Sequence, residues 1–252
     1  MINILMSGCN GKMGQVISRL SSNSDELKIA AGFDLFNTIN NPYPVFTDFK
    51  ECDIKVDVII DFSNPDALEK LLDFATSKKI PLVLATTGLS PIQLKMLEAA
   101  SKRIPVFSSA NMSLGVNLLI DLVKRAAKVL ESNFDIEIVE KHHNQKIDAP
   151  SGTAIAIADA INSVLEQKQE YVYDRHSRRK KRSRTEIGIH AVRGGTIVGD
   201  HSVIFAGNDE IIEINHVAMS KEIFGVGALR AAKFLHDKKP GLYGMKDLFA
   251  ED

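Results

Sequence analysis

Short apolar runs alternate with helical patterns through the first third of the chain, and this alternation constrains the fold most strongly. Ile2–Ser7 is typical of a β-strand, and apolar residues from Met13 to Leu20 then recur at helical spacing. Four further strands follow, at Leu27–Asp34, Val56–Phe62, Pro81–Ala85 and Val106–Phe107. Because strands separated by helices favour a parallel sheet with right-handed crossovers, we predict an α/β domain with a doubly wound sheet.

Two helices in this region have recognisable start signals. Ser63–Asp66 places polar capping residues around a proline, and Ser90–Gln93 has the spacing of a capping box with Pro91 at the first helical position. We therefore expect helices to begin directly after these segments.

The pattern changes near Asn111. Leu114–Leu130 predicts an apolar helix, and the alternation in Phe134–Ile138 predicts a strand with one covered face. Two antiparallel hairpins are expected later. The first joins Glu186–Arg193 to Thr196–Phe205 through Gly194-Gly195, and the second joins that latter strand to Ile211–Val217. A final helix runs through Ala228–Leu235. We predict a second, α+β domain with a mixed or antiparallel sheet at 114–218, and a first domain built from 1–113 and 219–252.

Composition is consistent with two globular domains. The chain has 252 residues, of which 44% are hydrophobic and 25% charged. Lys and Arg number 31 against 32 Asp and Glu, so no global charge points to nucleic acid or a membrane as partner. Two cysteines, Cys9 and Cys52, are too few for a disulfide framework or a Cys-based metal site. With no leader-like or membrane-spanning run, we expect a cytoplasmic protein.

A glycine-rich turn separates the first strand from the first helix. Gly8–Gly14 reads G-x-x-G-x-x-G, with Asn10 where a second glycine is common in nucleotide-binding loops. Asp34 ends the second strand, at the distance where an acid hydrogen-bonds an adenosine ribose. Although an ordinary turn is the alternative, the position favours a Rossmann-type dinucleotide site. Because no arginine adjoins Asp34, NADH is preferred over NADPH, while Lys12 leaves NADPH possible.

The segment Glu140–Ala154 carries the chemistry. His142, His143 and Lys146 can transfer protons or bind carboxylates, and they lie in one turn. Ser151, Gly152 and Thr153 stand at the expected amino end of a helix, which attracts anions. Each residue alone is more often structural, but their concentration favours a site for a small dianionic acid. No metal site is expected, because adjacent histidines project differently and no third ligand is evident nearby.

Residues 142–154 resemble the signature of 4-hydroxy-tetrahydrodipicolinate reductases, formerly called dihydrodipicolinate reductases. The resemblance covers essentially the whole chain and includes segments in family order. These segments are Gly8–Gly14, Asp61–Ser63, Ala85–Gly88, Ser109–Met112, Val198–His201 and Gly241–Tyr243. Ala85 departs from the pattern, because glycine is common at that position.

The resemblance implies an NAD(P)H-dependent oxidoreductase of diaminopimelate and lysine biosynthesis, with a dicarboxylate substrate. It implies His142 and Lys146 as the acid/base pair, with His143, Gly152 and Thr153 holding substrate beside Ser151. It also implies a homotetramer. The residues implied to contact the dinucleotide are Gly8, Cys9, Asn10, Gly11, Lys12, Met13, Asp34, Phe62, Ala85, Thr86, Thr87, Ser109, Ala110, Asn111 and Met112.

Two rival functions remain from the residues alone. One is another two-domain dehydrogenase acting on an amino-acid semialdehyde or a sugar, which the turn at His142–Lys146 disfavours. The other is a dinucleotide-sensing regulator that binds nucleic acid through the basic run Arg175–Arg184. That run lacks interleaved aromatic residues and is predicted to be a solvated loop between a helix and a strand.

Overall fold

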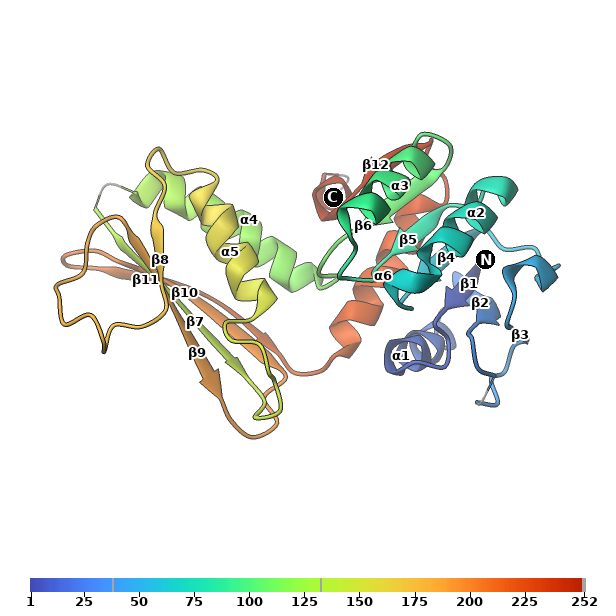
Figure 1. The fold of residues 1–252 in the computed structure, drawn as a ribbon, viewed down its shortest axis with the longest axis horizontal. Coiled ribbons are helices and arrows are strands. Elements are labelled where there is room, and N and C mark those ends of the chain that lie inside the picture. The colour runs from blue at the N-terminus through green and yellow to red at the C-terminus, as the bar shows by residue number, and fades with distance from the viewer. Residues whose placement is uncertain (38, 132, 251–252) are drawn as a thin grey trace. The chain divides into compact units, whose positions relative to one another are not determined.

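The computed structural model describes residues 1–37, 39–131 and 133–250 (Figure 1). The chain forms two compact units. The first comprises Met1–Ser113 with Glu222–Asp252, and the second comprises Leu114–Lys221. Each unit has its own sheet.

The first unit contains a parallel sheet in the order β12-β6-β5-β4-β1-β2-β3. Its strands are β1 (Ile2–Ser7), β2 (Leu27–Phe33), β3 (Val45–Phe46), β4 (Val58–Asp61), β5 (Leu82–Leu84), β6 (Pro105–Ser108) and β12 (Gly241–Tyr243). The predicted doubly wound parallel sheet is confirmed. The edge strands β3 and β12 were not predicted, because two or three residues are too few to show a period.

Helices cover both faces of this sheet (Figure 1). They are α1 (Lys12–Ser21), α2 (Leu68–Lys78), α3 (Pro91–Ser101), α6 (Glu222–Leu235) and the short α7 (Met245–Phe249), with 3-10 turns at Phe49–Glu51 and Pro65–Ala67. α1 packs beside α6, and α2 packs beside α3. The predicted capping box of Ser90 and Gln93 is present, and the Asn64 side chain caps the 3-10 turn that precedes α2.

The strand order reverses at β1, which lies between β2 and β4. Because all these strands are parallel, their carboxyl ends share one edge of the sheet. In open sheets of this kind, ligands bind at that edge beside the reversal. The buried side chains of β1 and β4, together with α2 and α3, form the core that holds this edge in place.

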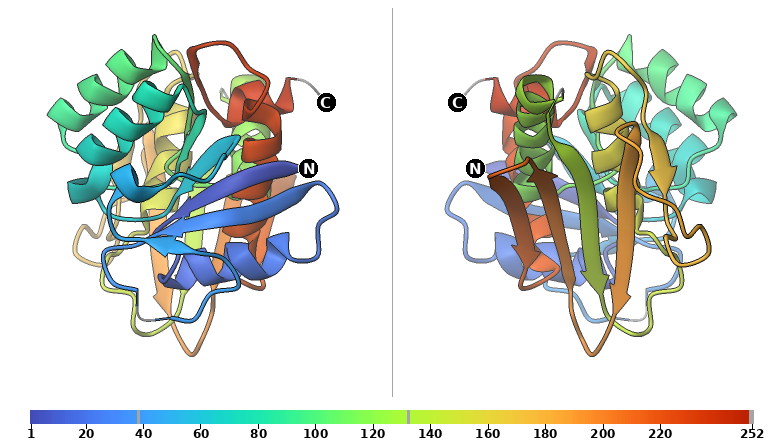
Figure 2. Two further views of the ribbon diagram at one scale, coloured as in Figure 1. Left: turned by 90° about the vertical axis from the view of Figure 1, so that its right-hand side faces the viewer. Right: turned by 90° about the vertical axis from the view of Figure 1, so that its left-hand side faces the viewer.

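The second unit contains a mixed sheet in the order β11-β10-β7-β9-β8. The strands are β7 (Asp135–His142), β8 (Glu170–Val172), β9 (Glu186–Arg193), β10 (Gly199–Ala206) and β11 (Ile211–Ala218). Helices α4 (Leu114–Leu130) and α5 (Gly152–Asn162) cover one face, and among residues 114–131 and 133–221 no helix covers the other face (Figure 2). The predicted α+β character and the helix at Leu114–Leu130 are confirmed.

The predicted hairpin between β9 and β10 is wrong. β7 lies between them, parallel to β9 and antiparallel to β10. The reason lies at the turn, where the Gly194 N–H donates to the His142 carbonyl and Gly195 accepts from the Asn144 N–H. The glycines therefore pair with the end of β7 and carry the chain across it. The second predicted hairpin, β10 with β11, is confirmed.

The basic run Arg175–Arg184 is also not simply a solvated loop, and it joins two strands, β8 and β9. Arg182 donates to Asp135 at 2.7 Å and to Glu137 at 3.0 Å, while Arg175 donates to Glu186 at 3.0 Å. Arg175 and Arg182 thus hold the loop against the sheet through ion pairs with acidic side chains of β7 and β9.

No helix within residues 1–37, 39–131 and 133–250 is both long and apolar enough to cross a membrane.

Candidate active site

The turn after β1 is compressed against its neighbours. Gly8 has a φ of 77°, and a Cβ there would lie 2.6 Å from the Phe62 carbonyl oxygen. A Cβ on Gly14, in the first turn of α1, would lie 2.2 Å from the Gly8 carbonyl oxygen. Both glycines are therefore required sterically, and the chain is left with a bare backbone turn at the amino end of α1.

Asp34 joins this turn to the end of β2. Its carboxylate accepts from the Asn10 N–H at 2.9 Å and from the Phe36 N–H at 3.4 Å. The Asn10 side chain donates to the Phe36 carbonyl and accepts from Asn41 at 2.8 Å. Asn10 does not have the left-handed backbone that its type permits; the positive φ lies at Gly8 instead. Asn10 fixes the loop through its side chain.

The side chains of this loop differ in accessibility. Gly11 and Lys12 are exposed, Met13 is half-buried, and Cys9 is fully buried. Burial, with a further contribution from the charge of Asp34, raises the pKa of the Cys9 thiol to about 12. Cys9 is therefore an unreactive thiol, and any contribution to binding comes from its backbone.

The remaining predicted cofactor residues follow three parallel strands. Phe62 comes after β4, Ala85–Thr87 after β5, and Ser109–Met112 after β6. The structure thus brings all the predicted dinucleotide residues to the carboxyl edge of one sheet. Ser109 stabilises its own turn, because its hydroxyl donates to the Asn111 carbonyl at 2.8 Å.

Asp61 is an anchor that sequence reasoning did not assign. It is 1% exposed, and its carboxylate accepts from the hydroxyls of Thr86 at 2.5 Å and Ser63 at 2.7 Å. Burial raises the pKa of Asp61. Its side chain ties the loop after β4 to the loop after β5. The sequence marked Asp61 as the end of a strand and as part of the family segment Asp61–Ser63, but neither signal gave its side chain a role.

A groove runs along this edge past Asp34. A cavity of about 150 Å³ is lined by Gly8, Phe33, Asp34, Leu35, Phe62, Ser63, Asn64 and Ala67. A second cavity of about 290 Å³ shares Phe33, Leu35, Asn64 and Ala67 and extends to Lys70. The bare turn, the acid at the end of β2 and the groove between them fit a dinucleotide.

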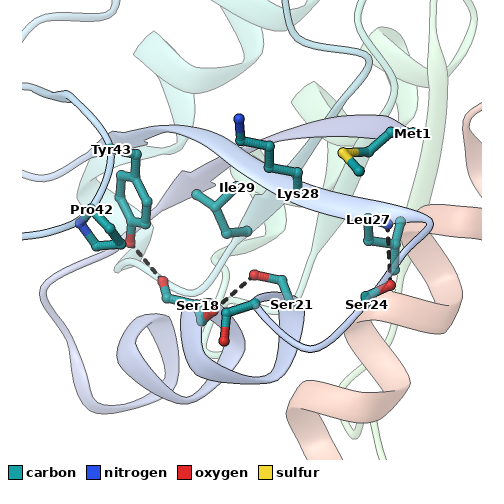
Figure 3. A pocket seen from close by; sticks show the side chains of 10 residues that line it. Met1, Ser18, Ser21, Ser24, Leu27, Lys28, Ile29, Pro42 and Tyr43 are labelled. Atoms are coloured by element: carbon teal, nitrogen blue, oxygen red, sulfur yellow. Dashed lines mark hydrogen bonds between the residues drawn. The ribbon is translucent and has the colours of Figure 1, made fainter.

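Another cavity of the first unit lies at the opposite, amino edge of β1 and β2 (Figure 3). It measures about 310 Å³ and is lined by serines of α1 and by Tyr43. The Ser18 hydroxyl is 2.6 Å from the Tyr43 hydroxyl, and the Ser21 hydroxyl donates to the Ser18 carbonyl at 2.9 Å. No predicted site residue lines this cavity, so it is separate from the dinucleotide groove.

In the second unit, His142 ends β7 beside a fully buried glutamate. Its Nδ1 is 2.6 Å from the Glu140 carboxylate. Arg193 of β9 donates to both oxygens of Glu140, at 2.8 and 2.7 Å. Burial alone would raise the pKa of Glu140, but the hydrogen bonds from Arg193, His142 and the Ser151 N–H outweigh it and lower that pKa. The glutamate is therefore ionised at neutral pH.

The turn after His142 holds Lys146. Its backbone N–H donates to the His143 carbonyl at 3.1 Å, and its ammonium is 2.8 Å from the Asp148 carboxylate. The hydrogen bond from Lys146 lowers the pKa of Asp148. Lys146 is 21% exposed and Asp148 59% exposed, so the ion pair is accessible to solvent.

Ser151, Gly152 and Thr153 begin α5 as predicted. The Ser151 hydroxyl accepts from the Ala154 N–H at 3.1 Å and is 3.0 Å from His201 Nε2. Ser151 is 2% exposed, so its side chain caps the helix and contacts β10. Gly152 is exposed at the same helix end, where the dipole favours an anion.

His201 and Arg193 are two members of this cluster that sequence reasoning did not assign. The His201 ring stands edge-on to the His142 ring, with centroids 5.3 Å apart. Burial, and next the charge of His142, lower the pKa of His201 to about 4. Both residues come from strands far along the chain, so no local pattern places them here. Glu140 could have been placed, because residues two apart on a strand share a face.

Comparison with known proteins identifies the family over nearly the whole length. Residues 2–112 match the family described as dihydrodipicolinate reductase, N-terminus, and residues 115–249 match its C-terminus. The chain is 60% identical over 248 residues to the 4-hydroxy-tetrahydrodipicolinate reductase of Caldanaerobacter subterraneus subsp. tengcongensis, covering 98% of each chain. It is 50% identical over 245 residues to the enzyme of the same name from Clostridium tetani, covering 97% of this chain and 96% of that one.

Solved structures agree. The fold matches a dipicolinate-bound dihydrodipicolinate reductase from Paenisporosarcina sp. TG-14 with a TM-score of 0.82 and 25% identity, over 98% of this chain and 99% of that one. A DAP dehydrogenase of C. glutamicum shares the fold alone, with a TM-score of 0.57 and 15% identity over 100% of this chain and 99% of that one. On these matches, the chain belongs to the dihydrodipicolinate reductase family.

Proposed function

We propose that this chain reduces 4-hydroxy-tetrahydrodipicolinate to tetrahydrodipicolinate with a reduced pyridine nucleotide, as a step of diaminopimelate and lysine biosynthesis. Full-length identity of 60% to a reductase of that name carries the proposal. The buried Glu140–His142 pair beside the amino end of α5 supports it, because this arrangement provides a proton-transfer group next to an anion site.

The first unit, 1–113 with the C-terminal segment from about 219, is proposed to bind the dinucleotide. The turn from Gly8 to Met13 holds the pyrophosphate, and Asp34 accepts hydrogen bonds from the adenosine ribose. Phe62, Ala85–Thr87 and Ser109–Met112 line the path of the nicotinamide end. When bound, the cofactor supplies the hydride, and these residues orient it.

The second unit, about 114–218, is proposed to bind the dicarboxylate. The related protein from Paenisporosarcina has dipicolinate bound, which supports a planar dianion as the ligand class. His143, Lys146 and the start of α5 at Ser151, Gly152 and Thr153 are the groups of this chain that would hold its two carboxylates.

Proton transfer completes the reaction. Water leaves the substrate, the hydride adds to a conjugated ring carbon, and the enamine that results takes a proton on the neighbouring carbon. His142 or Lys146 supplies that proton, and the cationic groups of the turn stabilise negative charge in the transition state.

NADH is the proposed preferred cofactor. The Asp34 carboxylate would repel a 2′-phosphate, and the next two residues, Leu35 and Phe36, offer no positive charge to bind one. Lys12, exposed at the start of α1, keeps NADPH usable.

A homotetramer built on the second sheet is proposed as the assembly. The helix-free face of that sheet carries exposed apolar side chains, among them Val192, Ile211 and Val217 at 45%, 64% and 57% exposure. Two free, buried cysteines suit a reducing compartment, so the cytoplasm is the proposed location.

The test is oxidation of NADH and NADPH with substrate generated in place from pyruvate and aspartate semialdehyde by a coupled synthase. Turnover that depends on the synthase, and is faster with NADH, is expected. Dinucleotide binding without turnover would refute the substrate assignment and leave the dinucleotide assignment intact.

A further inference from the structure

Glu140 is a fully buried carboxylate with every hydrogen bond in place. Its Oε2 accepts from His142 Nδ1 at 2.6 Å and from Arg193 Nη1 at 2.8 Å. Its Oε1 accepts from the Ser151 N–H at 2.9 Å and from Arg193 Nη2 at 2.7 Å. A glutamate with 0% exposure and four short contacts has one orientation, so the groups it binds are held in one orientation too.

The first consequence concerns the His142 ring. An ionised carboxylate only accepts hydrogen bonds, so the nitrogen facing it must carry a proton. Nδ1 therefore has the hydrogen, and Nε2 is the nitrogen that can gain or lose one. Nε2 has no hydrogen-bond partner in the described part of the chain, and it lies where a Cβ on Gly199 would approach to 3.0 Å.

The second consequence concerns the segment between His142 and α5, residues 143–151. Arg193 Nη2 also donates to the Asp148 carbonyl at 2.7 Å, and Glu140 binds the Ser151 N–H. The ion pair thus holds the segment through the His142 ring at its start and through Asp148 and Ser151 near α5. The proton-transfer ring and the anion-binding helix end are positioned by one carboxylate.

We propose that Glu140, oriented by Arg193, is a positioning residue that selects the Nδ1–H form of His142 and couples its ring to the amino end of α5. The inference rests on the proton-transfer role proposed for His142.

The same strand provides a matched control. Glu137 also accepts from a histidine and an arginine, His190 at 2.7 Å and Arg182 at 3.0 Å. Because it lies three positions before Glu140, it faces the opposite side of the sheet, where no predicted site residue lies. Glu137→Gln therefore neutralises a carboxylate with similar partners, and it changes no contact of His142.

The experiment compares Glu140→Gln with Glu137→Gln by steady-state kinetics and by ¹⁵N NMR of the histidine rings. Glu140→Gln is expected to lower kcat about 100-fold or more, because loss of the orienting carboxylate allows the wrong tautomer. Dinucleotide affinity should stay unchanged, and the His142 nitrogen shifts should move toward a tautomer mixture. Glu137→Gln should keep wild-type kcat and His142 shifts.

Two further variants keep the outcome decisive. If Glu140→Gln fails to fold, Glu140→Asp retains the charge but withdraws the carboxylate from Nδ1, and it should lose kcat without losing the fold. In a His142→Gln background, Glu140→Gln should add little further loss, because the two residues act as one unit.

A folded Glu140→Gln or Glu140→Asp variant with wild-type kcat and unchanged His142 shifts would overturn the inference. If His142→Gln loses turnover but the Glu140 variants do not, the inference about Glu140 is overturned, and the proton-transfer role of His142 stands. Full turnover in His142→Gln would instead reject the proposed chemistry, and this inference with it.

Discussion

The two units build their candidate sites from different materials. In the first unit, the site consists of backbone turns that follow successive parallel strands. The turn that begins at Gly8 contacts Asp34 directly, as the sequence motif predicts. In the second unit, the site consists of side chains from three strands and a helix end, packed around Glu140. A turn motif is local and visible in a sequence, whereas a side-chain network exists only once distant strands pair.

The largest expected effect lies in the network. His142→Gln should lower kcat by about 10²- to 10⁴-fold, the usual contribution of a positioned acid or base, with dinucleotide affinity unchanged. Steady-state kinetics together with NADH titration of the free protein would measure both. His190→Gln, on the other face of the sheet, is the matched control. Undiminished turnover in His142→Gln would move the chemistry to another residue.

The same network should make stability depend on pH. The pKa of His201 is lowered to about 4, whereas an unfolded histidine titrates near about 6.5. Between these values the unfolded chain takes up a proton that the folded chain does not, so stability falls as pH decreases. The difference corresponds to on the order of 3 kcal/mol at pH 4.

His201→Gln should therefore flatten the stability curve between pH 6.5 and about 4. Urea unfolding of both proteins across that range would measure it. His176→Gln, which removes an exposed histidine, should leave the slope close to wild type. If the curves of wild type and His201→Gln run parallel, the ring is not buried in its neutral form.

The difference between the units also explains how much the sequence could predict. The capping box at Ser90 and the turn at Gly8 follow from residues within a few positions of one another. The parallel sheet follows from the alternation of such local strand and helix patterns along the chain. The helix start at Ser151 was predictable for the same reason.

The features that could not be predicted depend on pairing between strands that are far apart in the sequence. The expected hairpin of β9 with β10 was wrong, because β7 takes the position between them. This order is what brings Arg193 and His201 to opposite sides of the His142 strand, so missing it meant missing both residues. The anchoring of Arg182 was missed likewise, because its acidic partners lie on β7.

A smaller effect is expected in the first unit, where the backbone of α6 lies close to the loop that contains Met112. A Cβ on Gly227 of α6 would lie 1.7 Å from the Met112 carbonyl oxygen, which belongs to the proposed cofactor loop. Gly227→Ala should destabilise the protein by about 1 to 3 kcal/mol and weaken NADH binding, because a backbone carbonyl has to move.

Thermal unfolding and NADH titration would check this prediction. Gly225→Ala in the same helix is the control, because the atoms nearest to its Cβ would be side-chain atoms of Leu20 at 2.9 Å and of Ile17 and Val16 at 3.3 Å, rather than a backbone carbonyl. Equal behaviour of the two alanine variants would mean that the Met112 loop yields easily and is not held by α6.

The smallest effect tests whether the local motif alone sets cofactor choice. Asp34→Asn keeps an oxygen that can accept from the Asn10 N–H but removes the charge that would repel a 2′-phosphate. The NADPH to NADH ratio of kcat/KM should rise about tenfold, equivalent to about 1.4 kcal/mol. Asp25→Asn controls for net charge, because Asp25 is exposed and lies before the start of β2, whereas Asp34 follows its end.

Because Asp34 belongs to the first unit and the acid/base network to the second, kcat with saturating NADH should barely change. A fall in kcat as large as that of His142→Gln would mean that the two sites are not independent.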